Sequence, residues 1–240
     1  MAKLKIPSLQ HLARVWHPDP VRIQKALVAL VRNSPNFSYE PVFELVRDLI
    51  YLKVPYSQIE QAVIEKVKRE DVRKNFLSLL PLVQKHFQDI EINFVHQVAR
   101  RFYPVGRELA IPFSPPLIYG SSGRLHLPWF SFWRSNPLDK ERLALFITVV
   151  DDILAQDPDL EESEFSFLDF SAPDSKSDRR LVVLPGKNIA RVSDQERNEM
   201  LMIFVRGFQL AKSELVNSYN DGKVQSQIIA KDDDQIPLFE

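Results

Sequence analysis

The stretch LIYGSSGRLHLPWFSF, residues 117–132, carries the strongest fold signal in the chain. Two runs rich in β-forming and aromatic residues flank the segment Gly120-Ser121-Ser122-Gly123. Glycine and serine at such a position are typical of a tight turn between antiparallel strands. We therefore predict a β-hairpin that pairs residues 117–119 with residues 124–132.

Four large aromatic residues lie at the end of this hairpin: Trp129, Phe130, Phe132 and Trp133. Alternate residues of a strand face opposite sides, so Phe130 and Phe132 share one face, and Trp129 and Trp133 share the other. This alternation favours burial of all four rings in a core. The alternative is a nucleic-acid surface on which the rings stack unpaired bases while neighbouring arginines, 124 and 134, hold phosphates.

The chain before the hairpin shows helical periodicity over residues 20–88. Four helices are expected, starting near residues 20, 40, 57 and 71. Ser57 and Glu60 match a capping box at the start of the third helix, and Pro81 is expected to kink or divide the fourth. Because the connecting loops are short, neighbouring helices are predicted to pack antiparallel.

The chain after the hairpin alternates between helix and strand patterns. We expect a helix over residues 139–156, strands over 164–170 and 180–184, and a long helix from Ser193 to about residue 216. Ser193 and Glu196 again match a capping box. The whole pattern predicts an α+β, mostly helical protein. It has an N-terminal antiparallel helical region (1–91), an α+β region with a small sheet flanked by helices (92–217) and a flexible C-terminal tail (218–240).

Composition indicates a globular protein of the reducing cytoplasm. Of 240 residues, 45% are hydrophobic and none is cysteine, which excludes disulfides and thiolate sites. The longest apolar run, residues 143–150, is far shorter than the roughly 20 residues that span a bilayer. We therefore expect no membrane association. The N-terminal residues lack the apolar segment of a secretory signal.

Charge is distributed unevenly along the chain. Residues 1–134 hold 19 Lys and Arg against 11 Asp and Glu, and residues 135–240 hold 12 against 21. A basic front half suits contact with a polyanion, although the excess also fits charges spread over solvated helix faces. Acidic residues 65, 70 and 71 interrupt the first basic run. The candidate nucleic-acid contacts are Lys66, Lys68, Arg69, Arg73, Lys74, Arg100, Arg101 and Arg107.

No motif predicts a catalytic residue, a metal site or a cofactor. The five histidines are scattered, and no two have the i, i+4 spacing that would place them on one helix face. The order of helix, hairpin, helix, strand and helix over residues 92–216 nevertheless resembles the core of the restriction-endonuclease-like (PD-(D/E)XK) nuclease family. That family holds a divalent metal with acidic residues and a lysine on its strands. No acidic residue and no lysine occurs in residues 117–119 or 129–133. Upstream, only Glu108 could be a remaining metal ligand. The resemblance therefore implies a degenerate copy of the fold without its catalytic motif.

Residues 235–239, QIPLF, resemble the short peptide by which bacterial replication and repair proteins bind the replicative sliding clamp. Its pattern is Gln-Leu-(Ser/Asp)-Leu-Phe, which Gln235, Leu238 and Phe239 match outright and Ile236 matches conservatively. The resemblance implies that Leu238 and Phe239 fill an apolar pocket while the Gln235 amide forms hydrogen bonds at its rim. The alternatives are a chance match and docking of the two apolar residues onto the protein's own surface.

Three hypotheses follow from the sequence. The leading one is a non-catalytic accessory protein of bacterial DNA replication or repair, tethered to the sliding clamp, with DNA as a second candidate partner. The second is a metal-dependent nuclease that uses Glu108. The third is a helical protein-interaction module without a nucleic-acid role.

Overall fold

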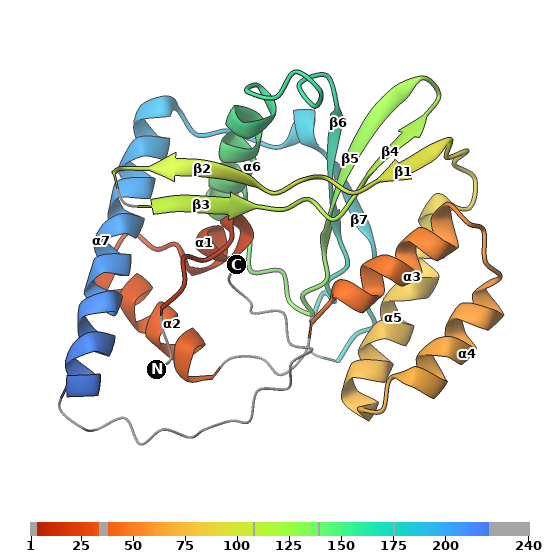
Figure 1. Ribbon diagram of the computed structural model, residues 1–240, viewed down its shortest axis with the longest axis horizontal. Helices are drawn as coiled ribbons and strands as arrows, with labels where there is room; N and C mark the ends of the chain where they lie inside the picture. Colours follow the sequence, from red (N-terminus) through yellow and green to blue (C-terminus); the bar gives the residue numbers. More distant parts are fainter. Residues whose placement is uncertain (1–3, 34–37, 108, 139, 175, 221–240) are drawn as a thin grey trace.

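A five-stranded mixed sheet lies at the centre of the computed structural model, which describes residues 4–33, 38–107, 109–138, 140–174 and 176–220 (Figure 1). β5 and β6 are parallel, and the other neighbouring pairs are antiparallel. The α+β class predicted from the sequence is confirmed. The strands lie in the order β1 (Phe94–His96), β4 (Ile118–Ser121), β5 (Arg124–Ser131), β6 (Glu164–Asp169) and β7 (Val182–Pro185).

The predicted hairpin is formed by β4 and β5. Tyr119 pairs with His126 and Ser121 pairs with Arg124, so the turn consists of Ser122 and Gly123. Both turn residues have positive φ, 51° and 72°, as the tight turns that suit twisted antiparallel strands require. The sequence placed the turn over residues 120–123, but Gly120 and Ser121 belong to β4, so the loop is two residues shorter than predicted and the register differs accordingly.

The parallel pair β5–β6 is covered on both faces because its large side chains alternate. Leu127, Trp129, Phe165 and Phe167 belong to one hydrophobic cluster, and Phe130, Phe132, Leu168 and Phe170 belong to the other. The burial predicted for the aromatic residues of the hairpin is confirmed: Trp129, Phe130 and Phe132 are at most 5% exposed, and Trp133 packs partly buried against the first cluster. These rings are therefore core residues and are not a surface for base stacking.

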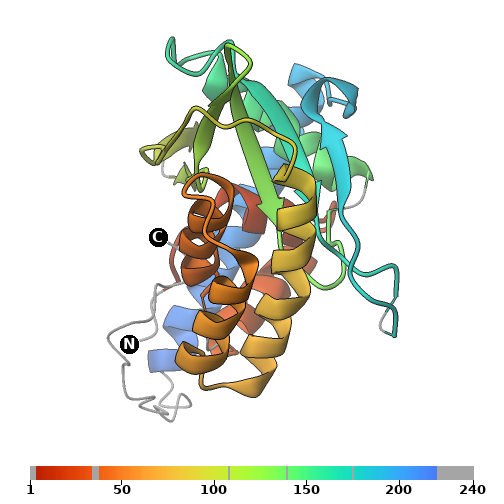
Figure 2. The same ribbon diagram turned by 90° about the vertical axis from the view of Figure 1, so that its right-hand side faces the viewer.

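Helices divide between the two faces of the sheet. On one face, α3 (Glu40–Ile50), α4 (Tyr56–Lys66) and α5 (Glu70–Phe87) pack side by side (Figure 2). On the other lie α1 (Leu9–Val15), α2 (Pro20–Arg32), α6 (Lys140–Leu154) and α7 (Asp194–Asn220). α2 and α3 are consecutive in sequence but contribute to different clusters, so they are not the antiparallel neighbours that loop length predicted.

Two local predictions about these helices need correction. α4 begins at Tyr56 after Pro55 and has no side-chain cap, so Ser57 and Glu60 form no capping box. α5 runs without a break through Pro81. Pro81 is exposed, so water can satisfy the carbonyl group that its ring leaves without a donor.

A second hairpin, β2 (Arg101–Val105) and β3 (Leu109–Phe113), was not predicted. Each strand contains a proline, Pro104 or Pro112, and proline within a run argues against a strand in sequence analysis. This hairpin forms a sheet of only two strands, so both strands are edges, where proline costs little. It packs against α6 and α7.

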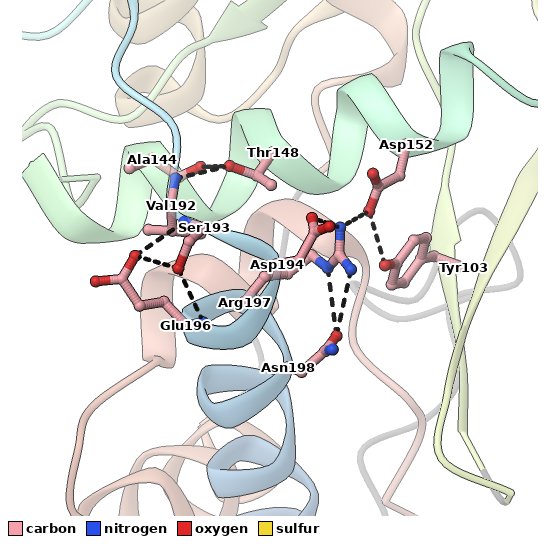
Figure 3. A network of polar contacts seen from close by, with 10 residues as sticks. All are labelled: Tyr103, Ala144, Thr148, Asp152, Val192, Ser193, Asp194, Glu196, Arg197 and Asn198. Atoms are coloured by element: carbon pink, nitrogen blue, oxygen red, sulfur yellow. Dashed lines mark hydrogen bonds and ion pairs between the residues drawn. The ribbon is translucent and has the colours of Figure 1, made fainter.

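The start of α7 is joined to α6 and β2 by polar contacts (Figure 3). The Arg197 guanidinium donates to Asp152 at 2.8 Å and to Asp194 at 3.0 Å, and the Tyr103 hydroxyl also donates to Asp152 at 2.8 Å. Burial, reinforced by this carboxylate, raises the pKa of Tyr103 to about 12. These polar groups form hydrogen bonds with one another, so we interpret the network as structural.

The capping box predicted at α7 is present in the same region. The Ser193 amide donates to the Glu196 carboxylate at 2.8 Å, and the Glu196 amide donates to the Ser193 hydroxyl at 3.3 Å. α7 then continues to Asn220, past the predicted end near residue 216. A short 3-10 turn, η1 (Gly186–Asn188), follows β7.

We predict that Gly207→Ala destabilises the protein, although the same change in an exposed helix normally stabilises by about 1 kcal/mol. A Cβ atom at residue 207 would lie 2.6 Å from the Ile23 Cβ and 2.9 Å from the Pro20 carbonyl oxygen, so α2 would have to move. Overpacking of this kind costs about 1–3 kcal/mol. The measurement is the free energy of unfolding in urea. Ser213→Ala, at an exposed position of α7, is the matched control, and a more stable Gly207→Ala protein would contradict the packing of α2 on α7.

Candidate functional site

The first predicted basic group lies at the junction of α4 and α5. Arg69 forms an ion pair with Asp71 and Lys74 forms one with Glu70, both at 2.6 Å. These side chains are mostly exposed, so each pair contributes little to stability but offsets the local positive charge. Lys66, Lys68 and Arg73 belong to the same segment.

The second basic group lies on the hairpin of β2 and β3. Arg101 is paired with Asp157 at 2.5 Å, and the Nε of Arg100 donates to the Ser114 hydroxyl at 3.3 Å. Arg107 follows Gly106 in the exposed turn. Figure 1 places this turn and the α4–α5 junction at opposite ends of the molecule. The eight predicted basic residues therefore do not form one patch.

The other predicted site residues lie outside the described part of the chain. These are the peptide residues Gln235, Ile236, Leu238 and Phe239, together with Glu108. Neither β4 nor β5 contains a carboxylate or a lysine. Within the residues that the structure describes, no group of three or more His, Cys, Asp or Glu side chains is placed to hold a metal ion. The helices described in the structure also include none with the length and apolar character needed to cross a membrane.

Arg179 forms a buried network where the sheet meets α5. Its Nη1 donates to the carbonyl oxygens of Phe132, Trp133 and Phe170 at 2.9 to 3.1 Å, and its Nη2 donates to the Asn75 side chain at 2.5 Å. The Asn75 amide donates in turn to the Tyr39 hydroxyl at 2.8 Å. Burial lowers the pKa of Arg179.

This network joins four segments of the chain through one side chain. Because three of its acceptors are backbone carbonyls at the ends of β5 and β6, the guanidinium replaces donors that would otherwise come from another strand. Arg179 is only 8% exposed, so the arrangement offers no access to a substrate. We interpret it as a structural clamp.

A basic hollow of about 440 Å³ lies between α1, α2 and the start of α6. Three guanidinium groups and an imidazole line it: Arg14, Arg22, Arg142 and His17. Its apolar floor includes Val15, Ala26 and Leu30. Among the described lining residues there is no carboxylate. This is the candidate functional site of the folded body.

Arg14, one of the residues that line the basic hollow, packs against an aromatic ring. The Arg14 guanidinium lies 5.4 Å from the centre of the Trp133 ring, and His11 meets the edge of the same ring. The Trp16 indole donates to the Met200 carbonyl at 3.0 Å, which holds α1 against α7. Burial, with a smaller effect of Arg14, lowers the pKa of His11 to about 4.

Sequence reasoning did not find this hollow. Three of its cationic or imidazole residues lie within residues 14–22, which is a visible cluster of basic side chains. Arg142 is remote in sequence, and nothing in the chain indicates that the start of α6 packs beside α1. Asp19 lies within the same segment, so a search for basic runs without acidic residues would not have selected it.

Comparison with protein-family models gives no match to this chain, and no curated protein matches it significantly. The class that the structure defines is a three-layer α+β protein with a mixed sheet. Its function must be argued from its own residues.

We predict that Arg179→Met lowers the free energy of unfolding by about 3 kcal/mol or more, because three buried carbonyls and the Asn75 amide lose their donor. Arg180→Met is the matched control, since the neighbouring arginine is exposed. We expect the control to change stability by no more than about 0.5 kcal/mol. Urea unfolding measures both, and equal effects would refute the clamp.

We predict that His11 makes the protein less stable as pH falls. In the folded protein the His11 pKa is about 4, below the ordinary value of 6.5. Between these two pH values the imidazole is therefore protonated in the unfolded chain but neutral in the folded one. The free energy of unfolding is therefore unaffected by His11 above about pH 6.5, and it declines as the pH falls from 6.5 towards 4. Between pH 7 and pH 5, the wild-type protein should lose about 2 kcal/mol more than His11→Gln. Urea unfolding at both pH values tests this, and parallel losses would contradict the assignment.

Proposed function

We propose that this chain is an accessory protein of bacterial DNA replication or repair, tethered to the sliding clamp through residues 235–239. The observation that carries the proposal is the peptide itself, in which Gln235, Leu238 and Phe239 match the clamp-binding pattern. Two adjacent large apolar residues and one amide are the kind of concentrated anchors that let a short peptide bind.

The position of the peptide relative to the body supports this role. The last described helix, α7, ends at Asn220, and residues 221–234 separate it from Gln235. α7 is fixed to α6 and β2 through Arg197, so a partner that binds the peptide would hold the whole body nearby. A tether of this length raises the local concentration of the body at a nearby target without any further contact.

DNA is the second partner that we propose. A clamp-bound protein is kept close to DNA, and the cationic surfaces at the α4–α5 junction and at the β2–β3 hairpin would then act at high local concentration. Several of their charges are already offset by acidic neighbours, so we expect weak contacts that depend on salt.

The test uses the full chain and a purified bacterial sliding clamp, with affinity measured by calorimetry. We expect Leu238→Ala with Phe239→Ala to lower the affinity at least about a hundredfold, because both apolar anchors are lost. The matched control, Ile228→Ala with Ile229→Ala, removes two apolar side chains from the same segment and should bind as the wild type does.

Three outcomes would overturn the proposal. The first is an intact chain that does not bind the clamp, and the second is an equal loss in the two double variants. Binding of the body to the clamp that survives both changes would place the interface elsewhere and would also contradict the tether.

A further inference from the structure

We propose that the hollow between α1, α2 and α6 binds the protein's own C-terminal peptide, residues 235–239, and so competes with the sliding clamp for that peptide. Docking of the peptide involves this chain alone, whereas the competition rests on the proposed function. Three features support docking: the position of the hollow relative to the end of α7, its apolar surface, and the anchors that the peptide offers.

The hollow lies close to the point where the described chain ends. One face of α2 borders the hollow, and another face packs against α7, where the Gln24 amide donates to the Glu214 carboxylate at 2.8 Å. A helix is about 10–12 Å wide, and the rise from Glu214 to Asn220 is about 9 Å. The end of α7 therefore lies within roughly 25 Å of the hollow.

Residues 221–234 are long enough to cover this distance. Fully extended they span at most about 50 Å, and a chain of that length has a root-mean-square end-to-end distance of roughly 20 Å. The effective concentration of a tethered group is highest when this distance matches the separation to be spanned. The peptide is therefore well placed to meet the hollow.

A smaller apolar pocket is a poorer candidate to receive the peptide. About 180 Å³ in volume, it is lined by Leu49, Ile50 and Phe87 among others. These residues belong to the layer of α3, α4 and α5, which Figure 1 shows on the other side of the molecule from α7. Reach therefore favours the hollow beside α2.

The hollow offers an apolar surface to large side chains. Val15 of α1 and Ala26, Ala29 and Leu30 of α2 form the apolar part of its lining, and its volume is about 440 Å³. Ala26 and Ala29 lie on one face of α2, and their small side chains leave the space above them open. A cavity of about 150 Å³ holds one benzene molecule, so the hollow has room for two adjacent large side chains.

The peptide supplies anchors that suit this surface. Leu238 and Phe239 are adjacent large apolar residues, and such concentrated anchors let a short segment bind. Pro237 restricts the backbone and reduces the entropy that is lost when the peptide is ordered. The Asn33 side chain, which lines the hollow, has the donors and the acceptor to exchange hydrogen bonds with the Gln235 amide.

Net charge is not the basis of this recognition. Arg22 and Arg142 line the hollow, but Asp19 and Glu141 lie close to them in the sequence. We therefore assign the selectivity to the apolar contacts, which distinguish Leu238 and Phe239 from a merely acidic segment.

Docking and clamp binding exclude one another because both use Leu238 and Phe239. A short tether gives an effective concentration on the order of 1 mM. A Kd of about 100 µM for the separate peptide then corresponds to docking in about nine chains out of ten. The apparent affinity for the clamp would fall about tenfold, since only the remaining fraction presents its peptide.

The first experiment measures docking without the clamp, by fluorescence anisotropy. The acceptor is the full chain with Leu238→Ala and Phe239→Ala, which removes its own anchors. The probes are two labelled ten-residue peptides, residues 231–240 and, as a matched control, residues 221–230, which contain two adjacent isoleucines. We expect the first peptide to bind about tenfold more tightly than the control, and the wild-type chain to bind it about tenfold more weakly than the acceptor does.

The second experiment locates the site and measures the competition. Ala29→Trp fills the hollow from an exposed position of α2, and Ser213→Trp is the matched control at an exposed position of α7. In the acceptor, Ala29→Trp should abolish docking of peptide 231–240. In the chain with its natural peptide, it should raise the affinity for a purified bacterial clamp about tenfold, whereas Ser213→Trp should change neither quantity. Urea unfolding of both variants checks that the fold is retained.

Three results would refute the inference. They are equal binding of the two peptides, equal docking in the Ala29→Trp and Ser213→Trp variants, and equal clamp affinity in these two variants. Failure of both the intact chain and peptide 231–240 to bind the clamp would instead refute the proposed function, and the anisotropy experiment would still decide whether the peptide docks.

Discussion

The fold depends on the requirement that the parallel pair β5–β6 be buried on both faces. A parallel pair needs a crossover, which α6 provides, and a strand covered on both sides must present large apolar residues in both directions. β5 and β6 do so, with Trp129 and Phe167 on one side and Phe130 and Leu168 on the other. Each face must then be covered, and the remaining helices provide two separate layers.

The polar groups at the margins of these layers follow from the same constraint. Arg179 supplies donors to carbonyl groups at the ends of β5 and β6 and links them to α5 through Asn75. Arg197 links α7 to α6 and β2. In both places the charged side chain donates several hydrogen bonds within the fold. The basic hollow differs, because Arg14 lies over an aromatic ring and Arg22 contacts an imidazole.

Sequence patterns predicted the elements whose signals are local. The β4–β5 turn, the capping box of Ser193 and Glu196, and the alternation of the aromatic residues near 130 were all recognised because neighbouring residues determine them. The prolines of β2 and β3 concealed a hairpin whose strands are both edges. The same local reasoning misplaced a cap at Ser57, because the helix begins at Tyr56, directly after Pro55. Of the basic hollow, only the cluster of residues 14–22 was visible in the sequence.

The sequence by itself determined the α+β class, the existence of the β4–β5 hairpin and the clamp-like peptide at residues 235–239, because periodicity, turn residues and a short linear motif are all encoded within a few positions. Only the tertiary structure decided that α1 and α2 pack on one face of the sheet while α3, α4 and α5 pack on the opposite face. It alone brought Arg142 beside Arg14 and separated the two predicted basic groups. The physical reason is that loop length does not reveal which face of a sheet a helix will cover, since burial of both faces selects the arrangement of the whole chain at once.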